Sequence, residues 1–398
     1  MEKIIRSDKH ILIFKMGKIE LLEEYGTSYR PAGFISNIPD EIMTQLFAEK
    51  ETVIKKTIKK QKKVTAKKTS RKDYFNCLKK TISKTNSILG LIKVESIEGN
   101  AVFSATNKDQ YCIYKSDVVY NGNTFLACLD DIIVFTKDNN LSMTDGYMVS
   151  GNLKKEINIF YDDFPDAMPI DNYDNNFFID HSLLKKAITH SSTDTIKPVY
   201  NSVFISKDFY CSTDSRRLFL SGTTKDNNGT MMPYDTAKLI FKDAEIFINK
   251  KDNKAKIVID ESLVIYTRMI EGQFPNYKQV IPESFQSHYK IDKLDFLEKM
   301  KTIKSFTSEP AYKVVFEIKE NCFMLNAENS IVELNVDKYE MGTTECLRVN
   351  ASFIIDALKI MDNDIIDFKF NGYMEPIVIS DGKIQSIVMQ IQIKEKEE

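Results

Sequence analysis

The feature that most constrains the fold is an internal repeat of about 110 residues, the size of a modest domain. An amphipathic helical pattern that starts near Lys72 recurs near His181 and again near Lys293. A second helical pattern follows each of the three, and apolar–polar alternation typical of strands comes next. These second helices are expected within residues 123–131, 234–243 and 350–362, and the strands that follow them at Asp131–Phe135, Ala244–Ile248 and Asp364–Phe368.

The repeat predicts an α+β protein with three similar domains, each carrying two helices on antiparallel sheets. The strands between helices are too many and too closely spaced for a doubly wound parallel sheet, and neither a dinucleotide fingerprint nor a P-loop occurs. We expect the domains at residues 63–170, 171–284 and 285–398.

Residues 1–54 precede the repeats and are expected to form a separate extension, to which the sequence assigns no function. The alternation around Gly17 predicts a strand or hairpin within residues 10–21. Pro39 and Asp40 suit the first turn of a helix within residues 38–51.

Residues 55–72 form a basic linker that contains the expected first strand of the repeats, near Val64. Ten basic residues and no acidic one lie between Lys55 and Lys72. The whole chain has 55 basic and 57 acidic residues, so the rest of it carries a net charge of -12. Two interpretations stay open: a strip that binds phosphate groups, or a solvated linker without aromatics to stack on bases.

Composition excludes several other classes of protein. No stretch reaches the roughly 20 apolar residues of a membrane helix, and the N-terminus lacks the layout of a signal peptide. The six cysteines are scattered without a CxxC pair, which favours reduced thiols in the cytoplasm, and only four histidines occur. We therefore expect neither a metal site nor a cofactor.

Four segments, in this order along the chain, resemble the beta sliding clamp of bacterial replicative DNA polymerase. They are Thr213–Leu218, Tyr266–Pro282, Val349–Leu358 and Ile387–Ile391. The stretch that contains Phe274-Pro275-Asn276-Tyr277 is the most specific of them, although by itself it also fits a domain-connecting turn. The resemblance covers about residues 63–393 and implies the DNA clamp fold, in bacterial or bacteriophage-type form.

The resemblance implies a partner-peptide groove between the second and third domains. Methionine, valine, isoleucine and proline would give it an adaptable apolar lining, with Tyr200 and Arg217 as polar anchors at its edge. Carried over position by position, the lining is Tyr200, Thr213, Ser215, Arg217, Leu218, Pro275, Val280, Met374, Met389 and Ile391.

The chain departs from the family's pattern at several of these positions. Ser215 and Arg216 replace the family's Gly and His, and Gln390 and Gln392 replace its Pro and Arg. These changes bear on which peptide is preferred more than on the existence of a groove.

The first helix of each repeat carries lysines that the resemblance would place against DNA. Lysine outnumbers arginine 48 to 7, and lysine binds phosphate as a point charge without reading bases. An ordinary solvated helix face is the alternative for any one of them. The candidates are Lys79, Lys80, Lys84, Lys185, Lys186, Lys299, Lys301 and Lys304.

No catalytic constellation is visible, so we expect a protein that is not an enzyme. A metal-dependent nuclease or hydrolase is the alternative, with Asp162 and Asp163 as its candidates, but these residues also fit an inter-domain linker.

As a clamp, the chain would close head to tail into a homodimeric six-domain ring. A ring of the trimeric kind is less favoured, because each chain has three repeats rather than two. The implied partners are double-stranded DNA bound without sequence preference, a DNA polymerase, a clamp loader and a second copy of the chain, with no membrane. The implied location is the cytoplasm, or the host's cytoplasm for a viral protein.

Overall fold

The computed structural model describes residues 69–391, apart from 137–140, 145–146, 169, 171, 223–228, 309–310 and 341–345, together with four strands within residues 3–34. The chain divides into two compact units, residues 1–70 and 71–398. The boundaries expected at 170/171 and 284/285 fall inside the second unit and stay predictions.

The first unit contains a four-stranded antiparallel meander of β1 (Lys3–Arg6), β2 (His10–Lys15), β3 (Lys18–Tyr25) and β4 (Ser28–Phe34). Lys15 pairs with Lys18 across the turn between β2 and β3, so the hairpin expected around Gly17 is confirmed. The helix expected within residues 38–51 and most of the basic linker lie outside the described residues.

An eight-stranded antiparallel sheet joins the first two repeats. The strand β7 pairs with β19 from Leu263↔Tyr114 to Thr267↔Gln110, which makes one sheet from strands far apart in the sequence. Its order is β12 (Asn175–Ile179), β17 (Ala244–Asn249), β18 (Lys254–Val258), β19 (Leu263–Arg268), β7 (Gln110–Val119), β6 (Asn100–Thr106), β5 (Ile92–Ile97) and β8 (Phe125–Ala127).

A nine-stranded antiparallel sheet joins the second and third repeats in the same manner. Here β15 pairs with β28, from Arg217↔Val388 to Ser221↔Ile384. The order is β16 (Thr230–Pro233), β13 (Ser202–Ser206), β14 (Phe209–Thr213), β15 (Arg217–Gly222), β28 (Ile384–Val388), β27 (Ile377–Ser380), β26 (Ile365–Phe370), β20 (Ser287–Asp292) and β24 (Asp337–Glu340).

Two smaller antiparallel sheets belong to the first and last repeats. The first contains β11 (Leu153–Glu156), β10 (Tyr147–Ser150) and β9 (Ser142–Thr144). The second contains β23 (Ser330–Asn335), β22 (Cys322–Ala327), β21 (Lys313–Ile318) and β25 (Cys346–Asn350). Every strand pair between described residues is antiparallel, and the expected α+β class is confirmed.

Local sequence explains where the main helices begin. The carboxylates of Asp180 and Asp292 accept hydrogen bonds from the free backbone N–H groups of Leu183 (3.0 Å) and Asp295 (2.8 Å), and the Asn350 side chain accepts one from Ser352 (2.9 Å). The helices are α2 (Arg71–Thr81), α4 (His181–Ile188), α6 (Lys293–Lys304) and α7 (Ala351–Ile360), all four at predicted places.

The other two helices differ from expectation. Residues 123–131 were expected to be helical, but Phe125–Ala127 is strand β8 and the helix is α3 (Leu129–Phe135). The prediction of a strand at Asp131–Phe135 is therefore wrong. Leu129, Ile132 and Phe135 are spaced three residues apart and form the buried face of a helix. The helix expected at 234–243 shortens to α5 (Tyr234–Ala237).

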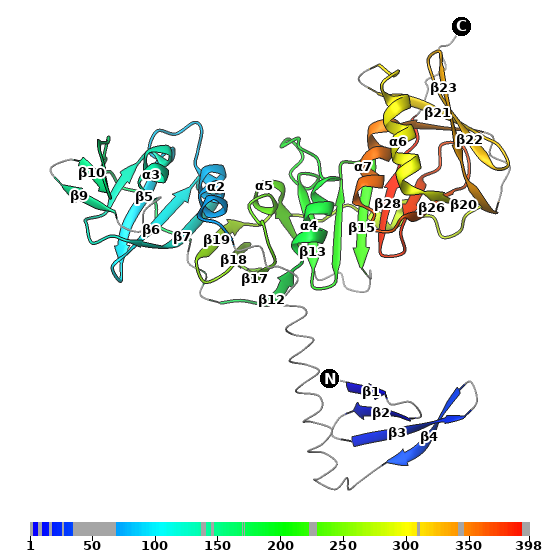
Figure 1. Ribbon diagram of the computed structural model, residues 1–398, viewed down its shortest axis with the longest axis horizontal. Helices are drawn as coiled ribbons and strands as arrows, with labels where there is room; N and C mark the ends of the chain where they lie inside the picture. The colour runs from blue at the N-terminus through cyan, green and yellow to red at the C-terminus, as the bar shows by residue number, and fades with distance from the viewer. Residues whose placement is uncertain are drawn as a thin grey trace. The chain divides into compact units, whose positions relative to one another are not determined.

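The helices of the second unit follow one another in a row across the repeats (Figure 1). Lys79 of α2 pairs with Asp130 of α3 at 2.9 Å, and Lys80 of α2 donates to the carbonyl of Lys238 after α5 at 3.2 Å. Contacts between α5 and α4 continue the row, and Lys186 of α4 pairs at 2.6 Å with Asp362, just beyond α7. Packing of α7 on α6 completes it. No helix among the described residues could span a lipid bilayer.

An aromatic cluster fills the core of the last repeat. Phe368 of β26 is fully buried, and its ring lies 5.7 to 6.1 Å from the rings of Phe296, Phe316 and Phe323, and 5.8 Å from that of Phe370. These rings come from α6, β21, β22 and β26, so one cluster holds the helix of the repeat against both of its sheets.

Candidate functional site

The candidate groove begins at a tight turn between β14 and β15. The Thr213 hydroxyl donates to the carbonyl of Arg217 at 2.7 Å and accepts from the N–H of Ser215 at 3.1 Å. One carboxylate oxygen of Asp214 accepts from the N–H groups of both Arg216 and Arg217, each at 3.0 Å. Ser215 adopts a φ of 77°, a left-handed conformation where the family that the sequence resembles has glycine.

The second wall is the segment after β19, which ends in the 3-10 turn η1 (Tyr277–Val280). Tyr277 stacks on Phe209 with ring centroids 5.5 Å apart, and Phe274 lies 5.3 Å from Phe204. These contacts press the segment onto a small apolar cluster that includes Leu218 and lies on the nine-stranded sheet. The segment is therefore both the connection between two repeats and a wall of the groove.

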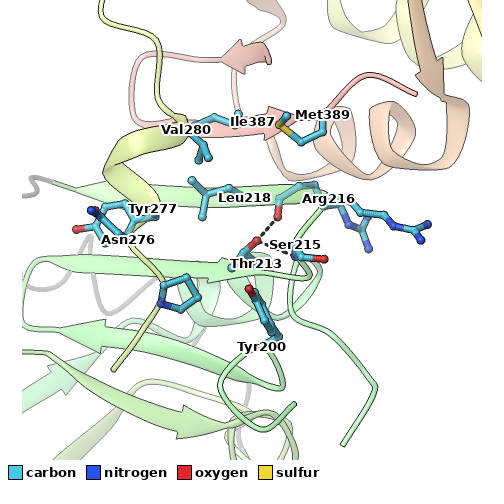
Figure 2. A pocket seen from close by; sticks show the side chains of 12 residues that line it. Tyr200, Thr213, Ser215, Arg216, Leu218, Asn276, Tyr277, Val280, Ile387 and Met389 are labelled. Carbon is cyan, nitrogen blue, oxygen red and sulfur yellow. Dashed lines mark hydrogen bonds between the residues drawn. The ribbon is translucent and has the colours of Figure 1, made fainter. Parts of the chain in front are cut away.

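A pocket of about 200 Å³ opens between these walls (Figure 2). Leu218 and Ile387 are partners across β15 and β28, and Val280 at the end of η1 lines the same pocket. Eight of the ten residues expected at the groove line this pocket: Tyr200, Thr213, Ser215, Arg217, Leu218, Pro275, Val280 and Met389. Four further residues, Arg216, Asn276, Tyr277 and Ile387, complete the lining.

The two other expected groove residues, Met374 and Ile391, do not line the pocket. Met374 belongs to the loop between β26 and β27 and has a φ of 72°. Ile391 lies beyond β28, where its N–H donates to the carbonyl of Arg348 at 2.8 Å. Of the lining residues that were not predicted, Ile387 could have been found from the sequence. Alternate residues of a strand share a face, and Met389, two residues further on, was already assigned to the groove.

Arg217, expected as a polar anchor at the groove edge, lines the pocket and is also paired within the chain. Its guanidinium donates to Asp214 at 2.9 Å and to Asp356 of α7 at 2.7 Å. It also lies 4.7 Å from the ring centre of Phe353 on α7. Arg217 thus ties β15 to the last helix, with its charge already engaged by two carboxylates.

Gln390, which stands where the resembled family has proline, organises the loop that contains Met374. Its side chain accepts from the N–H of Arg348 (3.3 Å) and donates to the carbonyls of Gly372 (2.8 Å) and Glu375 (2.9 Å). The side chain is buried and makes three hydrogen bonds to the backbone, and the Gly372 carbonyl also accepts from the N–H of Glu375 at 3.3 Å.

Gln390→Ala should destabilise the last repeat by about 2 kcal/mol, because the three hydrogen bonds of the buried side chain to the backbone would be lost. Thermal unfolding of the full chain measures the effect. Gln385→Ala is the matched control, since Gln385 is exposed on β28 of the same segment. Equal unfolding temperatures for the two variants would contradict this role of Gln390.

His190 lies buried beneath the junction of β15 and β28. Its Nε2 is 2.7 Å from the Ser386 hydroxyl of β28, and its Nδ1 is 2.8 Å from the Thr189 hydroxyl. Burial, together with the charge of Arg217, lowers the pKa of His190 from 6.5 to about 3. The folded protein therefore holds a neutral imidazole across this junction.

This neutral histidine predicts a pH dependence of stability. The pKa is lower in the folded than in the unfolded chain, so the stabilisation is complete above pH 6.5 and is lost as the pH falls toward 3. Between pH 7 and pH 5 the loss should be about 2 kcal/mol. Urea denaturation at the two pH values measures it, and His190→Gln should reduce the difference. An undiminished difference in that variant would assign the effect to other groups.

The candidate DNA-contacting lysines fall into two groups. Lys79, Lys80, Lys185 and Lys301 are exposed on the helices, and Lys84 is exposed just after the end of α2. Lys186, Lys299 and Lys304 are half-buried: Lys186 pairs with Asp362, Lys299 with Asp295 at 3.2 Å, and Lys304 lies over the ring of Tyr312. The sequence interpretation missed Lys238 and Lys359, exposed lysines at the second helix of their repeats.

Asp162 and Asp163, the candidates for a metal-dependent enzyme, are both exposed in the segment between β11 and β12. Within the described parts of residues 69–391, no three His, Cys, Asp or Glu side chains gather in a way that could hold a metal ion.

Comparisons with known proteins point to the same family as the sequence motifs. Residues 278–393 match the family described as the C-terminal domain of the DNA polymerase III beta subunit. The chain is 27% identical to the beta sliding clamp of Rickettsia felis over 332 residues, covering 72% of this chain and 87% of that protein. It is 26% identical to the clamp of Rickettsia bellii over 343 residues, covering 75% and 90%.

Solved structures show the same fold. The beta subunit of DNA polymerase III from Thermotoga maritima superimposes with a TM-score of 0.71 at 21% identity, over 81% of this chain and 97% of that one. The sliding clamp of Bartonella birtlesii, solved with griselimycin bound, gives 0.69 at 18% identity, over 82% and 99%. Together with the ordered sequence motifs, these matches make the chain a homologue of the beta sliding clamp, the non-enzymatic processivity factor of DNA polymerase III.

Proposed function

We propose that two copies of this chain close head to tail into a ring around duplex DNA, and that the groove at the β15–β28 junction holds a peptide segment of a DNA polymerase or clamp loader. The observation that carries the proposal is the convergence of eight expected groove residues, from four separate parts of the sequence, on one pocket.

The chemistry of the groove suits an extended peptide. Leu218, Ile387 and Met389 present apolar surface, and Val280 is 40% exposed, so the wall is open to a partner side chain. A small pocket of this kind takes one or two apolar side chains and fixes them by shape, while polar groups at its edge set the register. Binding there would tether a polymerase and raise its effective concentration at the primer end.

The row of helices is the proposed DNA-facing surface. Every repeat contributes at least one exposed lysine to this surface. Examples are Lys80, Lys185 and Lys301. Lysine contacts to phosphates carry no sequence information and are weak one by one, which fits a ring that slides. The acidic remainder of the sequence would disfavour DNA on other surfaces.

Exposed sheet edges support closure into a ring. Among the residues that the structure describes, β23 pairs only with β22 and β11 only with β10, so each leaves one edge unpaired there. Ile331 on β23 is 64% exposed and Leu153 on β11 is 39% exposed. Unpaired edges with apolar side chains favour association with another strand, and a head-to-tail dimer would cover one edge with the other.

Native mass and topological retention on DNA test the proposal. Light scattering should give the mass of two chains. Protein loaded on nicked circular DNA should stay bound through a high-salt wash and be released once the circle is cut, because only a ring needs an end to escape. A monomer that binds circular and linear DNA equally would overturn the proposal.

A further inference from the structure

Two arginines line the pocket, and Arg216 is the one whose guanidinium has no ion-pair partner among the described residues. It is exposed at the rim of the pocket, beside Arg217 in sequence but in a different situation. Arg217 is engaged by two carboxylates, whereas among the described residues the Arg216 side chain makes no ion pair and no hydrogen bond. A guanidinium at the mouth of an apolar pocket is thus available to a ligand.

The backbone of Arg216 is held firmly even though its side chain is not. Its N–H donates to the Asp214 carboxylate at 3.0 Å, and its carbonyl accepts from the N–H of Met389 at 2.9 Å. Ser215, whose φ is 77°, defines the turn that precedes Arg216. The side chain therefore starts from a defined point next to Met389, which lowers the entropy lost when a ligand binds.

The two carboxylates that contact the neighbouring Arg217 both have other partners as well. Asp214 accepts two backbone hydrogen bonds and the ion pair from Arg217. Asp356 is shared between Arg217 at 2.7 Å and Lys359 at 3.7 Å. The rim at this end of the groove consequently presents a net positive charge, on a chain that is acidic outside its basic linker.

We propose that Arg216 makes the groove selective for peptides that carry a carboxylate at a fixed offset from their apolar anchor. This inference rests on the proposed peptide-binding function. The apolar side chain would enter between Leu218, Val280 and Met389, and the carboxylate would meet the guanidinium at the rim. Arginine suits the task because its planar fork binds a carboxylate through two parallel hydrogen bonds.

Selection from a displayed library of random decapeptides, with the full-length dimer as bait, tests the inference. Peptides that bind the wild-type chain but not the Met389→Glu variant define binders of the groove. Asp or Glu should be enriched in them at one offset from a Leu, Ile, Met or Phe. The Arg216→Glu variant should select Lys or Arg at that offset instead.

One selected peptide, resynthesised with a fluorescent label, gives the quantitative test. Asp→Asn in the peptide should weaken binding to the wild-type chain about fivefold, as expected for a solvent-accessible ion pair, and the difference should vanish in Arg216→Gln. Amidated and free-acid forms distinguish a side-chain carboxylate from the C-terminal one. Because Arg216 is exposed, Arg216→Gln should unfold at the same temperature as the wild-type chain. That measurement is the control for correct folding.

The outcomes separate the two hypotheses. If no selected peptide depends on Met389, the groove itself is misassigned and the proposed function loses its partner site. If peptides depend on Met389 but show no acidic enrichment, or if Arg216→Gln keeps the preference for Asp, the groove stands and the role of Arg216 is overturned.

Discussion

Met389→Glu is expected to abolish the stimulation of a DNA polymerase by this chain while leaving the proposed ring intact. Met389 lies half-buried at the pocket, next to Leu218 and Ile387. A bound peptide would enclose the new carboxylate in apolar surface without a partner, which costs at least about 2 kcal/mol and weakens binding by roughly thirtyfold or more. Primer extension on a long single-stranded template, with a polymerase that the wild-type chain stimulates, measures the loss.

The same substitution at Met374 is the matched control. The sequence resemblance placed both methionines in the groove, but Met374 lies outside the pocket, in the loop held by Gln390. Met374→Glu should therefore leave stimulation close to wild type. Both variants should keep the mass of two chains and be retained on circular DNA.

Two results would count against the groove. Stimulation that survives Met389→Glu would mean that the polymerase docks elsewhere. Equal loss in both variants would mean that the region responds to any added charge, so the pocket would have no special role.

Much of the fold was predictable from local sequence, because strong local signals agree with the tertiary structure. The helices α4, α6 and α7 have a capping Asp or Asn before an apolar periodic run, and the hairpin of β2 and β3 has alternation around a turn. The helix α3 was missed because only seven residues carry its pattern, too few to distinguish from a buried strand. Its preceding strand β8, with three residues, is specified by pairing with β5 rather than by its own sequence.

The residues that line the pocket were predictable where the chain keeps the family's sequence motifs. The partner of each charged side chain was less predictable, because it depends on residues far away in the sequence. Leu218 and Met389 reach the pocket through strand alternation and register, which sequence order fixes. Which of two adjacent arginines stays free depends on Asp356, which lies 139 residues away from Arg217 in the chain. Met374, which does not line the pocket, lies in a loop held by Gln390, a residue that replaces the proline of the family's pattern.

Phe368→Ala is expected to give the largest loss of stability. Its ring is fully buried and contacts rings from α6, β21 and β22. Removing the ring would leave a cavity that the surrounding paired strands cannot move to fill. Such a substitution costs about 3–5 kcal/mol. The midpoint of urea unfolding should fall accordingly. Ile365→Ala, on the same strand but 50% exposed, is the control and should change stability by less than about 1 kcal/mol.

The loss should also reach the groove, because β26 pairs with β27, and β27 with β28, whose residues line the pocket. Hydrogen exchange read by mass spectrometry should show faster exchange in β26–β28 of Phe368→Ala, with α2 and the eight-stranded sheet unchanged. Peptides captured by the wild-type chain should bind this variant more weakly even though no groove residue has changed. Uniform acceleration across residues 71–391 would show instead that the three repeats unfold as one cooperative unit, and that the cluster around Phe368 stabilises the whole of it.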